Sequence, residues 1–270
     1  MRRPRAYGNP SADEYVDFIC DALEPIIAQL IPGDSICLNL SNDVFVPGLP
    51  SRSLYRERTI LALCDRFNLH LMDSIIWNNP SKAPGPVQWA SIHRIQLHTA
   101  FEYIYWFTNS PTEVKADNRR VLQPHTDKHR RLMTQGGERT SRTACDKTYR
   151  IQPGSFGHAT TGRIPRNLLT LSHNCPDSRQ YRADARRLGL PIHGALQPLA
   201  IPTFLIQFLS EPDDLIVDPF GGTLTTGKAA EQLRRRWIVS EFLLEYIRGA
   251  AERFRTDPGF WIHPAMKQVR

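Results

Sequence analysis

Apolar side chains recur at helical spacing near the start of the chain. The capping box Ser11-Ala12-Asp13-Glu14 opens a stretch in which apolar residues return every three or four positions as far as Leu30. Pro25 predicts a bend inside this stretch, and Pro32-Gly33 ends it. Residues 54–67 show the same spacing. Two helices are therefore expected in the first 70 residues.

Segments rich in β-branched and aromatic residues alternate with the helical ones. Residues 35–40, 70–77 and 101–108 are typical of strands. Near the end of the chain the pattern predicts a helix at 200–209, a strand at 214–217 that ends at Asp218, a helix at 225–233, a strand at 237–240 that precedes Glu241, and a helix at 244–254. Helices that alternate with strands predict an α/β fold with a mostly parallel sheet.

This alternation fails between about residues 110 and 190, where the chain is polar and its apolar runs are short. Residues 111–190 hold 16 Lys and Arg against 7 Asp and Glu, a formal charge of +9, so the other 190 residues of this +7 chain sum to −2. A concentrated positive charge is typical of a surface that meets a polyanion, nucleic acid first among them. A solvated basic insertion that binds nothing is the alternative.

Composition narrows the class of protein further. With 41% hydrophobic and 23% charged residues, the chain is too apolar to be disordered. It contains no run of 18 apolar residues and no apolar segment behind its basic first residues, so we expect a cytoplasmic protein without a membrane segment. Its five cysteines are scattered and odd in number, which predicts neither disulfides nor a metal site.

The most informative local pattern spans residues 215–227. A predicted strand ends at Asp218, Gly221-Gly222 makes a turn through which the backbone passes close to a ligand, and a helix begins with its free amides facing that ligand. About 20 residues later, Glu241 ends the next strand, where a carboxylate binds both hydroxyls of a ribose. This combination predicts a site for an adenosine-type cofactor. A phosphate-binding P-loop is the alternative, but Ala229 stands where that loop needs a hydroxyl for magnesium.

The sequence Asp-Pro-Phe-Gly-Gly-Thr-x-Thr-Thr-Gly at 218–227, followed by Arg-Trp-Ile-Val-Ser-Glu at 236–241, resembles the S-adenosylmethionine site of the DNA amino-methyltransferases. The resemblance is strongest to N4-cytosine methylases of the PvuII kind. It extends over 5–9, 14–17, 46–53, 77–86, 164–169 and 211–215. It implies a restriction-modification or phage enzyme that methylates double-stranded DNA, with N6-adenine as the alternative target and a cognate restriction endonuclease as a possible partner.

The resemblance also implies an architecture. We expect a Rossmann-like methyltransferase sheet, circularly permuted, with a catalytic half at 1–110, a basic target-recognition region at 111–190 and a cofactor-binding half at 191–270. The implied cofactor-binding residues are Asp218, Phe220, Gly221, Gly222, Thr223, Thr225, Thr226 and Glu241. The candidates for DNA contact are Lys82, Arg94, Arg130, Arg131, Arg163 and Arg166.

One part of the family pattern is missing. Its catalytic tetrapeptide is Ser, Asp or Asn followed by Pro-Pro and an aromatic residue, and these 270 residues contain no adjacent prolines. In the family, the tetrapeptide comes just before the stretch that resembles 5–9. We therefore expect a chain that begins after its catalytic loop, lacks a central strand, exposes two strand edges and is inactive or poorly folded alone. A noncatalytic remnant that binds DNA or cofactor is the alternative from another functional class.

Overall fold

The computed structural model describes residues 11–143 and 149–267, which form two compact units. The smaller unit spans 117–166, and the larger combines the described residues before and after it.

The larger unit contains a four-stranded sheet in the order β1-β3-β2-β6. The strands are β1 (Ser35–Leu40), β2 (His70–Asn78), β3 (Phe101–Thr108) and β6 (Leu168–Thr170). β2 and β6 are parallel, whereas β3 runs antiparallel to both β1 and β2. The prediction of a mostly parallel sheet is wrong at β3, because this strand lies between β1 and β2 and pairs with each in the opposite direction.

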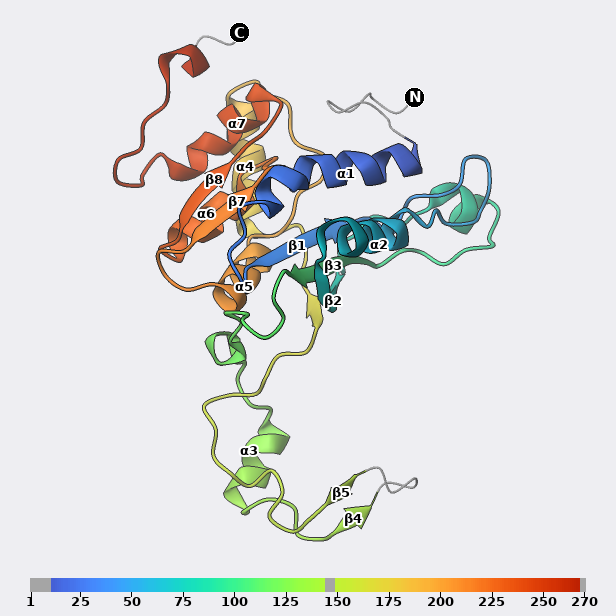
Figure 1. The fold of residues 1–270 in the computed structure, drawn as a ribbon, viewed down its shortest axis with the longest axis vertical. Helices are drawn as coiled ribbons and strands as arrows, with labels where there is room; N and C mark the ends of the chain where they lie inside the picture. The colour runs from blue at the N-terminus through green and yellow to red at the C-terminus, as the bar shows by residue number, and fades with distance from the viewer. Residues whose placement is uncertain (1–10, 144–148, 268–270) are drawn as a thin grey trace. The chain divides into compact units, whose positions relative to one another are not determined.

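Helices cover both faces of this sheet (Figure 1). On one face, α1 (Ala12–Ile27) and α2 (Tyr55–Phe67) bury an apolar cluster that includes Tyr105 and Phe107 of β3. On the other face, Ile104 packs in a cluster with α5 (Ala200–Leu209). Successive side chains of a strand point to opposite faces, so β3 contributes to both clusters. The capping box at Ser11 is present, with the Ser11 Oγ accepting from the Glu14 amide at 3.2 Å.

A second sheet carries the predicted cofactor turn. β7 (Leu215–Asp218) and β8 (Arg236–Val239) are parallel, with Asp218 opposite Val239. α6 (Thr225–Gln232) follows β7 and packs on α5, while α7 (Leu244–Ala251) packs on α4 (Pro176–Arg187). β1 and β7 each pair with only one strand among the residues that the structure describes.

The smaller unit consists of short elements joined by loops. It contains η2 (Asn118–Val121), α3 (Asp127–Thr134), β4 (Arg142–Thr143) and β5 (Arg150–Ile151), with β4 and β5 antiparallel. Val121 is the one buried apolar side chain among its described residues. A Cβ on Gly137 would lie 2.5 Å from the Gly154 carbonyl oxygen, so two backbone segments pack directly against each other there. The unit is therefore a loop-rich insertion with little apolar core.

This unit is narrower than the predicted region 111–190. Residues 167–190 belong to the larger unit, because Leu168–Thr170 pairs with β2 and the α4 side chains Tyr181 and Ala185 are buried beside α7. Residues 117–166 hold eleven Lys and Arg against four Asp and Glu, so their formal charge is +7 and the rest of the chain is neutral. The division of roles among 1–110, 111–190 and 191–270 stays a prediction.

Several short elements complete the described chain. A π-helical segment, η1 (Val87–Ile92), lies between β2 and β3, and the 3-10 turns η3 (Glu252–Phe254) and η4 (Pro264–Lys267) follow α7. Within 11–143 and 149–267, no helix has the length and apolar character needed to cross a membrane.

Candidate functional site

The turn between β7 and α6 packs tightly against the end of β8. The Gly221 amide donates to the Ser240 carbonyl at 2.8 Å, and a Cβ on Gly221 would lie 2.1 Å from Val239 Cγ1. Gly222 has a φ of +51°, in the left-handed region that glycine adopts without strain. Leu224 also has a positive φ, +54°, and directly precedes α6. The two glycines therefore let the chain reverse within reach of the β8 carboxyl end.

Glu241, which follows β8, is hydrogen-bonded to the turn that follows β7. Its Oε2 accepts from the Gly222 amide at 2.8 Å, and its Oε1 accepts from the Leu243 amide at 2.9 Å. Each carboxylate oxygen keeps a further lone pair, so the group can still accept two hydroxyl protons. The predicted pairing of a glycine turn with a strand-end acid is thus one hydrogen-bonded arrangement.

The other predicted cofactor residues lie on the same turn, in different roles. Asp218 ends β7, and its Oδ1 accepts from the Phe220 amide at 2.9 Å. The Phe220 side chain is exposed, and its ring lies 6.0 Å from that of Phe18 on α1. Thr223 and Thr225 are buried and share a hydrogen bond of 2.9 Å between their hydroxyls, so they support the turn from inside. Thr226 lies in the first turn of α6.

The P-loop alternative finds no support in the surroundings of α6. Lys228 donates to the Arg253 carbonyl oxygen and lies over the Phe254 ring, 5.6 Å from its centroid. Ala229, which follows it, is fully buried. The lysine that would bind phosphate is therefore engaged by the segment after α7.

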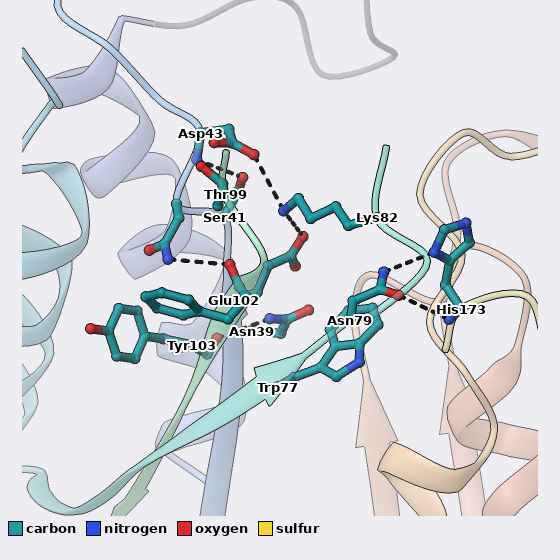
Figure 2. A network of polar contacts seen from close by, with 12 residues as sticks. Asn39, Ser41, Asp43, Trp77, Asn79, Lys82, Thr99, Glu102, Tyr103 and His173 are labelled. Atoms are coloured by element: carbon teal, nitrogen blue, oxygen red, sulfur yellow. Dashed lines mark hydrogen bonds and ion pairs between the residues drawn. The ribbon is translucent and has the colours of Figure 1, made fainter. Parts of the chain in front are cut away.

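A second polar cluster lies where the strands of the larger sheet end (Figure 2). The Lys82 ammonium is 2.9 Å from Glu102 Oε1 and 3.3 Å from Asp43 Oδ2, and its side chain is 18% exposed. Burial alone would raise the pKa of Asp43, but hydrogen bonding with Thr99 and the charges of Lys82 and Arg52 together lower that pKa below its usual value. Lys82, predicted to contact DNA, is thus already neutralised by two carboxylates, and its DNA contact stays a prediction.

Asn79 and His173 meet beside this cluster (Figure 2). Asn79 directly follows β2 and is 6% exposed, and its Nδ2 lies 2.8 Å from His173 Nδ1. Burial lowers the pKa of His173, and the positive charges of Arg182 and Lys82 lower it further against the opposing charge of Glu102. Lowering the pKa of a base favours its uncharged form, so these surroundings favour the neutral imidazole.

The remaining DNA-contact candidates are exposed and distributed over the chain. Arg94 follows η1 in the larger unit, with a φ of +58°. Arg130 and Arg131 lie on α3, where Arg130 pairs with Asp127. Arg163 Nε donates to the Pro124 carbonyl at 3.2 Å, and Arg166 ends the smaller unit. Four of these six predicted residues thus belong to the basic unit, and Lys82 and Arg94 to the larger one.

Three residues of the polar cluster were absent from the sequence prediction: Asp43, Glu102 and His173. Each lies at or beyond the end of a strand, Asp43 after β1, Glu102 at the start of β3 and His173 after β6. Only Asp43 could have been proposed from the sequence, because it lies three residues beyond the predicted strand at 35–40. Glu102 and His173 could be placed only from the strand order, which brings Asn79 and His173, 94 positions apart in sequence, into contact.

Comparison with known proteins identifies the class of protein that this fold and turn define. Residues 4–252 match the N6/N4 family described as DNA methylase. The chain belongs to this family of DNA methylases, and the expected resemblance is confirmed. It is 33% identical over 262 residues to the type II methyltransferase M.PvuII of Proteus hauseri. The matched segment covers 94% of this chain and 74% of that protein.

Solved structures agree with the sequence match. The PvuII DNA methyltransferase (cytosine-N4-specific) superposes with a TM-score of 0.70 at 30% identity, covering 96% of this chain and 77% of that one. A putative DNA modification methylase from Thermus thermophilus, solved in complex with S-adenosyl-L-methionine, has a TM-score of 0.53 at 19% identity, covering 92% and 80%. The second likeness supports the mixed α/β fold alone.

Proposed function

We propose that this chain is an S-adenosylmethionine-dependent DNA methyltransferase that acts on the N4 amino group of cytosine in double-stranded DNA. The observation that carries the proposal is the extent of similarity to M.PvuII, 33% identity over 94% of the chain. In this proposal the fold is the circularly permuted form, residues 111–190 recognise the target, and the cofactor binds at the turn between β7 and α6. The protein acts in the cytoplasm, alongside a cognate restriction endonuclease.

The geometry of the turn fits the cofactor. Glu241 holds the Gly222 amide at 2.8 Å and keeps lone pairs for the two ribose hydroxyls. Phe220 presents an exposed ring next to the turn, which suits contact with the cofactor. A Cβ on Gly221 would meet Val239, and a Cβ on Gly222 would face the His193 ring. Because both residues are glycine, the backbone itself borders the site. The cofactor supplies an electrophilic methyl group on sulfur, while these residues bind and orient it.

DNA binding is assigned to the smaller unit because of its charge. Eleven basic against four acidic residues in 50 positions give this unit the whole net charge of the protein. Arg and Lys contacts to phosphates position a protein on DNA without reading its sequence. Arg130, Arg131, Arg163 and Arg166 are the contacts proposed here, with Lys82 and Arg94 on the larger unit.

Methyl transfer needs a further element that these residues do not supply. The 270 residues hold no adjacent prolines and hence no tetrapeptide of the Pro-Pro-aromatic type that holds a flipped base and its amino group. We therefore expect the 270-residue chain to bind S-adenosylmethionine and DNA without turnover. This absence is also the observation that favours the second candidate, a noncatalytic DNA- or cofactor-binding protein.

Calorimetric titration with S-adenosylmethionine tests the cofactor site. Glu241→Ala removes a charged acceptor, so we expect binding at least tenfold weaker than in the wild type. Glu245→Ala, in the first turn of α7, is the matched control and should leave the affinity unchanged. A folded wild-type sample that binds no S-adenosylmethionine would overturn the assignment.

Transfer of radiolabelled methyl groups to duplex DNA separates the two candidate functions. Turnover by the 270 residues would contradict the expected inactivity. Turnover that appears only after a Ser-Pro-Pro-aromatic segment is supplied, fused to the chain or as a second polypeptide, supports the enzyme. Digestion of the product to nucleosides then distinguishes N4-methylcytosine from N6-methyladenine. No methylation under either condition would favour the noncatalytic candidate.

A further inference from the structure

Asn79 is held in one orientation by the backbone around it. Its side-chain oxygen accepts from the Ser81 amide at 3.2 Å and from the His173 amide at 3.4 Å, and the Ser81 hydroxyl lies 3.0 Å away. A backbone amide only donates, so the atom that it faces must be the oxygen of the Asn79 side chain and not its nitrogen. The amide nitrogen of Asn79 therefore points at the His173 ring.

This orientation fixes the proton on His173. Asn79 Nδ2 lies 2.8 Å from His173 Nδ1, and an amide nitrogen can only donate. Nδ1 must then be an acceptor without a proton, so the single proton of the neutral imidazole is on Nε2. A doubly protonated ring would direct an N–H against the N–H of Asn79, which agrees with the lowered pKa of His173.

The Nε2–H of His173 is available to a ligand. Nε2 makes no hydrogen bond with any residue in 11–143 or 149–267. It is also not buried, so a ligand can reach it. Two guanidinium groups lie nearby, since Arg182 Nη1 and Arg179 Nη1 both donate to Asn174, the next residue, at 3.2 and 3.1 Å. A neutral donor beside cationic groups suits an acceptor atom on a polyanion.

The position in the fold points to the same kind of ligand. β2 and β6 are parallel, and Asn79 and His173 lie just beyond their carboxyl ends, the edge of an α/β sheet where ligands bind. Ser81 and Ser172 add a hydroxyl contact of 2.7 Å that joins the same two segments. The segment that carries His173 also follows the basic unit in sequence by only seven residues.

We propose that His173 is a DNA-contacting residue whose tautomer is set by Asn79, so that Nε2 donates one hydrogen bond to an acceptor atom of bound DNA. Asn79 is the positioning residue in this arrangement. The inference rests on the proposed function in that it takes double-stranded DNA as the ligand. The acceptor is either a phosphate oxygen or an acceptor on a base edge, and the experiment below distinguishes them.

The tautomer can be measured on the free chain by long-range proton–nitrogen correlation spectra with ¹⁵N-labelled histidine. The signal of His173 is assigned by its loss in His173→Gln. We expect protonated Nε2 and unprotonated Nδ1 at pH 7. In Asn79→Asp, a carboxylate faces the ring and can only accept, so Nδ1 should become protonated. A wild-type His173 with its proton on Nδ1 would overturn the proposal.

DNA binding is measured by fluorescence anisotropy on a panel of duplexes of different sequence. His173→Phe keeps a ring without the donor and should weaken binding roughly five- to tenfold. His173→Gln, which carries an amide donor, should recover much of this loss. His70→Ala is the matched control, because His70 is exposed at the opposite end of β2. An equal loss on all duplexes indicates a phosphate contact, and a loss confined to some indicates a base contact.

The outcomes separate this inference from the proposed function. If the wild type binds duplex DNA and His173→Phe binds equally well, the contact is wrong and the proposed function stands. If a folded wild type binds no duplex DNA, both are wrong, whatever the tautomer of His173.

Discussion

Gly221 is the residue on which the packing of the turn between β7 and α6 depends most directly. A Cβ at this position would lie 2.1 Å from Val239 Cγ1 and 2.9 Å from the Ser240 carbonyl oxygen. Its amide also donates to that carbonyl at 2.8 Å. Any side chain here would push the turn away from the end of β8, and with it the Gly222 amide away from Glu241.

We expect Gly221→Ala to lower the free energy of unfolding by about 1–3 kcal/mol, as overpacking at a tight contact does. It should also weaken S-adenosylmethionine binding, because the turn and Glu241 no longer meet. Gly194→Ala is the control, since a Cβ there meets nothing within 4 Å. Urea unfolding of both variants checks this prediction, and equal midpoints for the two would contradict it.

Asp43 makes the stability of the polar cluster depend on pH. The pKa of Asp43 is lowered in the folded protein, where Lys82 and Arg52 face its carboxylate. A carboxyl with a lowered folded pKa stabilises the protein above its unfolded pKa, near 4, and this contribution is lost as the pH falls through the folded value.

The wild type should therefore be more stable than Asp43→Asn by about 1–2 kcal/mol at pH 7, with a difference that shrinks toward pH 3. Asp21→Asn, on the exposed side of α1, is the control and should show no comparable change. Unfolding free energies measured across this pH range test the prediction. A difference that is constant with pH would mean that the Asp43 charge contributes nothing.

At the scale of elements, the short helix α3 carries two of the proposed phosphate contacts. Arg130 and Arg131 are both exposed on it, and Thr126 caps the helix by accepting from the His129 amide. Replacing exposed arginines costs the helix little, so effects on DNA binding can be measured without loss of the fold.

The double variant Arg130→Ala, Arg131→Ala should weaken DNA binding uniformly across sequences. If both contact phosphates, the slope of log affinity against log salt should fall by about two, since each contact contributes roughly 0.9. The double variant Arg58→Ala, Arg66→Ala is the control, because these arginines pair with Asp13 and Asp17 of α1 in the unit without net charge. An unchanged salt slope would exclude α3 from the interface.

Elements with a strong apolar pattern were predicted at or near their bounds, and those without one were missed. β1 at 35–40 and α5 at 200–209 match the expected ranges, because both segments are rich in apolar residues. Half of the residues of α4 (Pro176–Arg187) are charged, and the helix buries only Ser178, Tyr181 and Ala185, so its sequence has the polarity of a loop. β6 has three residues, too few to establish a period.

At the scale of the whole molecule, the open strand edges of the described sheets are the places where chains can associate. β1 and β7 each pair with one strand in the described part of the chain. Leu215 and Val217 of β7 and Ile238 of β8 are exposed by 47, 41 and 59%. Open edges with apolar side chains promote association between chains.

We expect the 270-residue chain to associate through these exposed strands. Ile238→Lys should reduce the associated fraction, because a charge on such a strand opposes edge-to-edge pairing. Leu61→Lys, at an equally exposed helical position on α2, should change it much less. Sedimentation velocity measures the associated fraction of the wild type and of both variants. A monomeric wild type would contradict the prediction.

The sequence by itself determined the family and the glycine turn between β7 and α6, because the turn residues are neighbours in the chain and Glu241 follows within about 20 positions. It also located the positive charge, which depends on composition alone. Only the tertiary structure decided that β3 lies antiparallel between β1 and β2, that Lys82 is neutralised by Asp43 and Glu102, and that Asn79 meets His173. These contacts depend on strand order and register, which bring together residues that no local pattern connects.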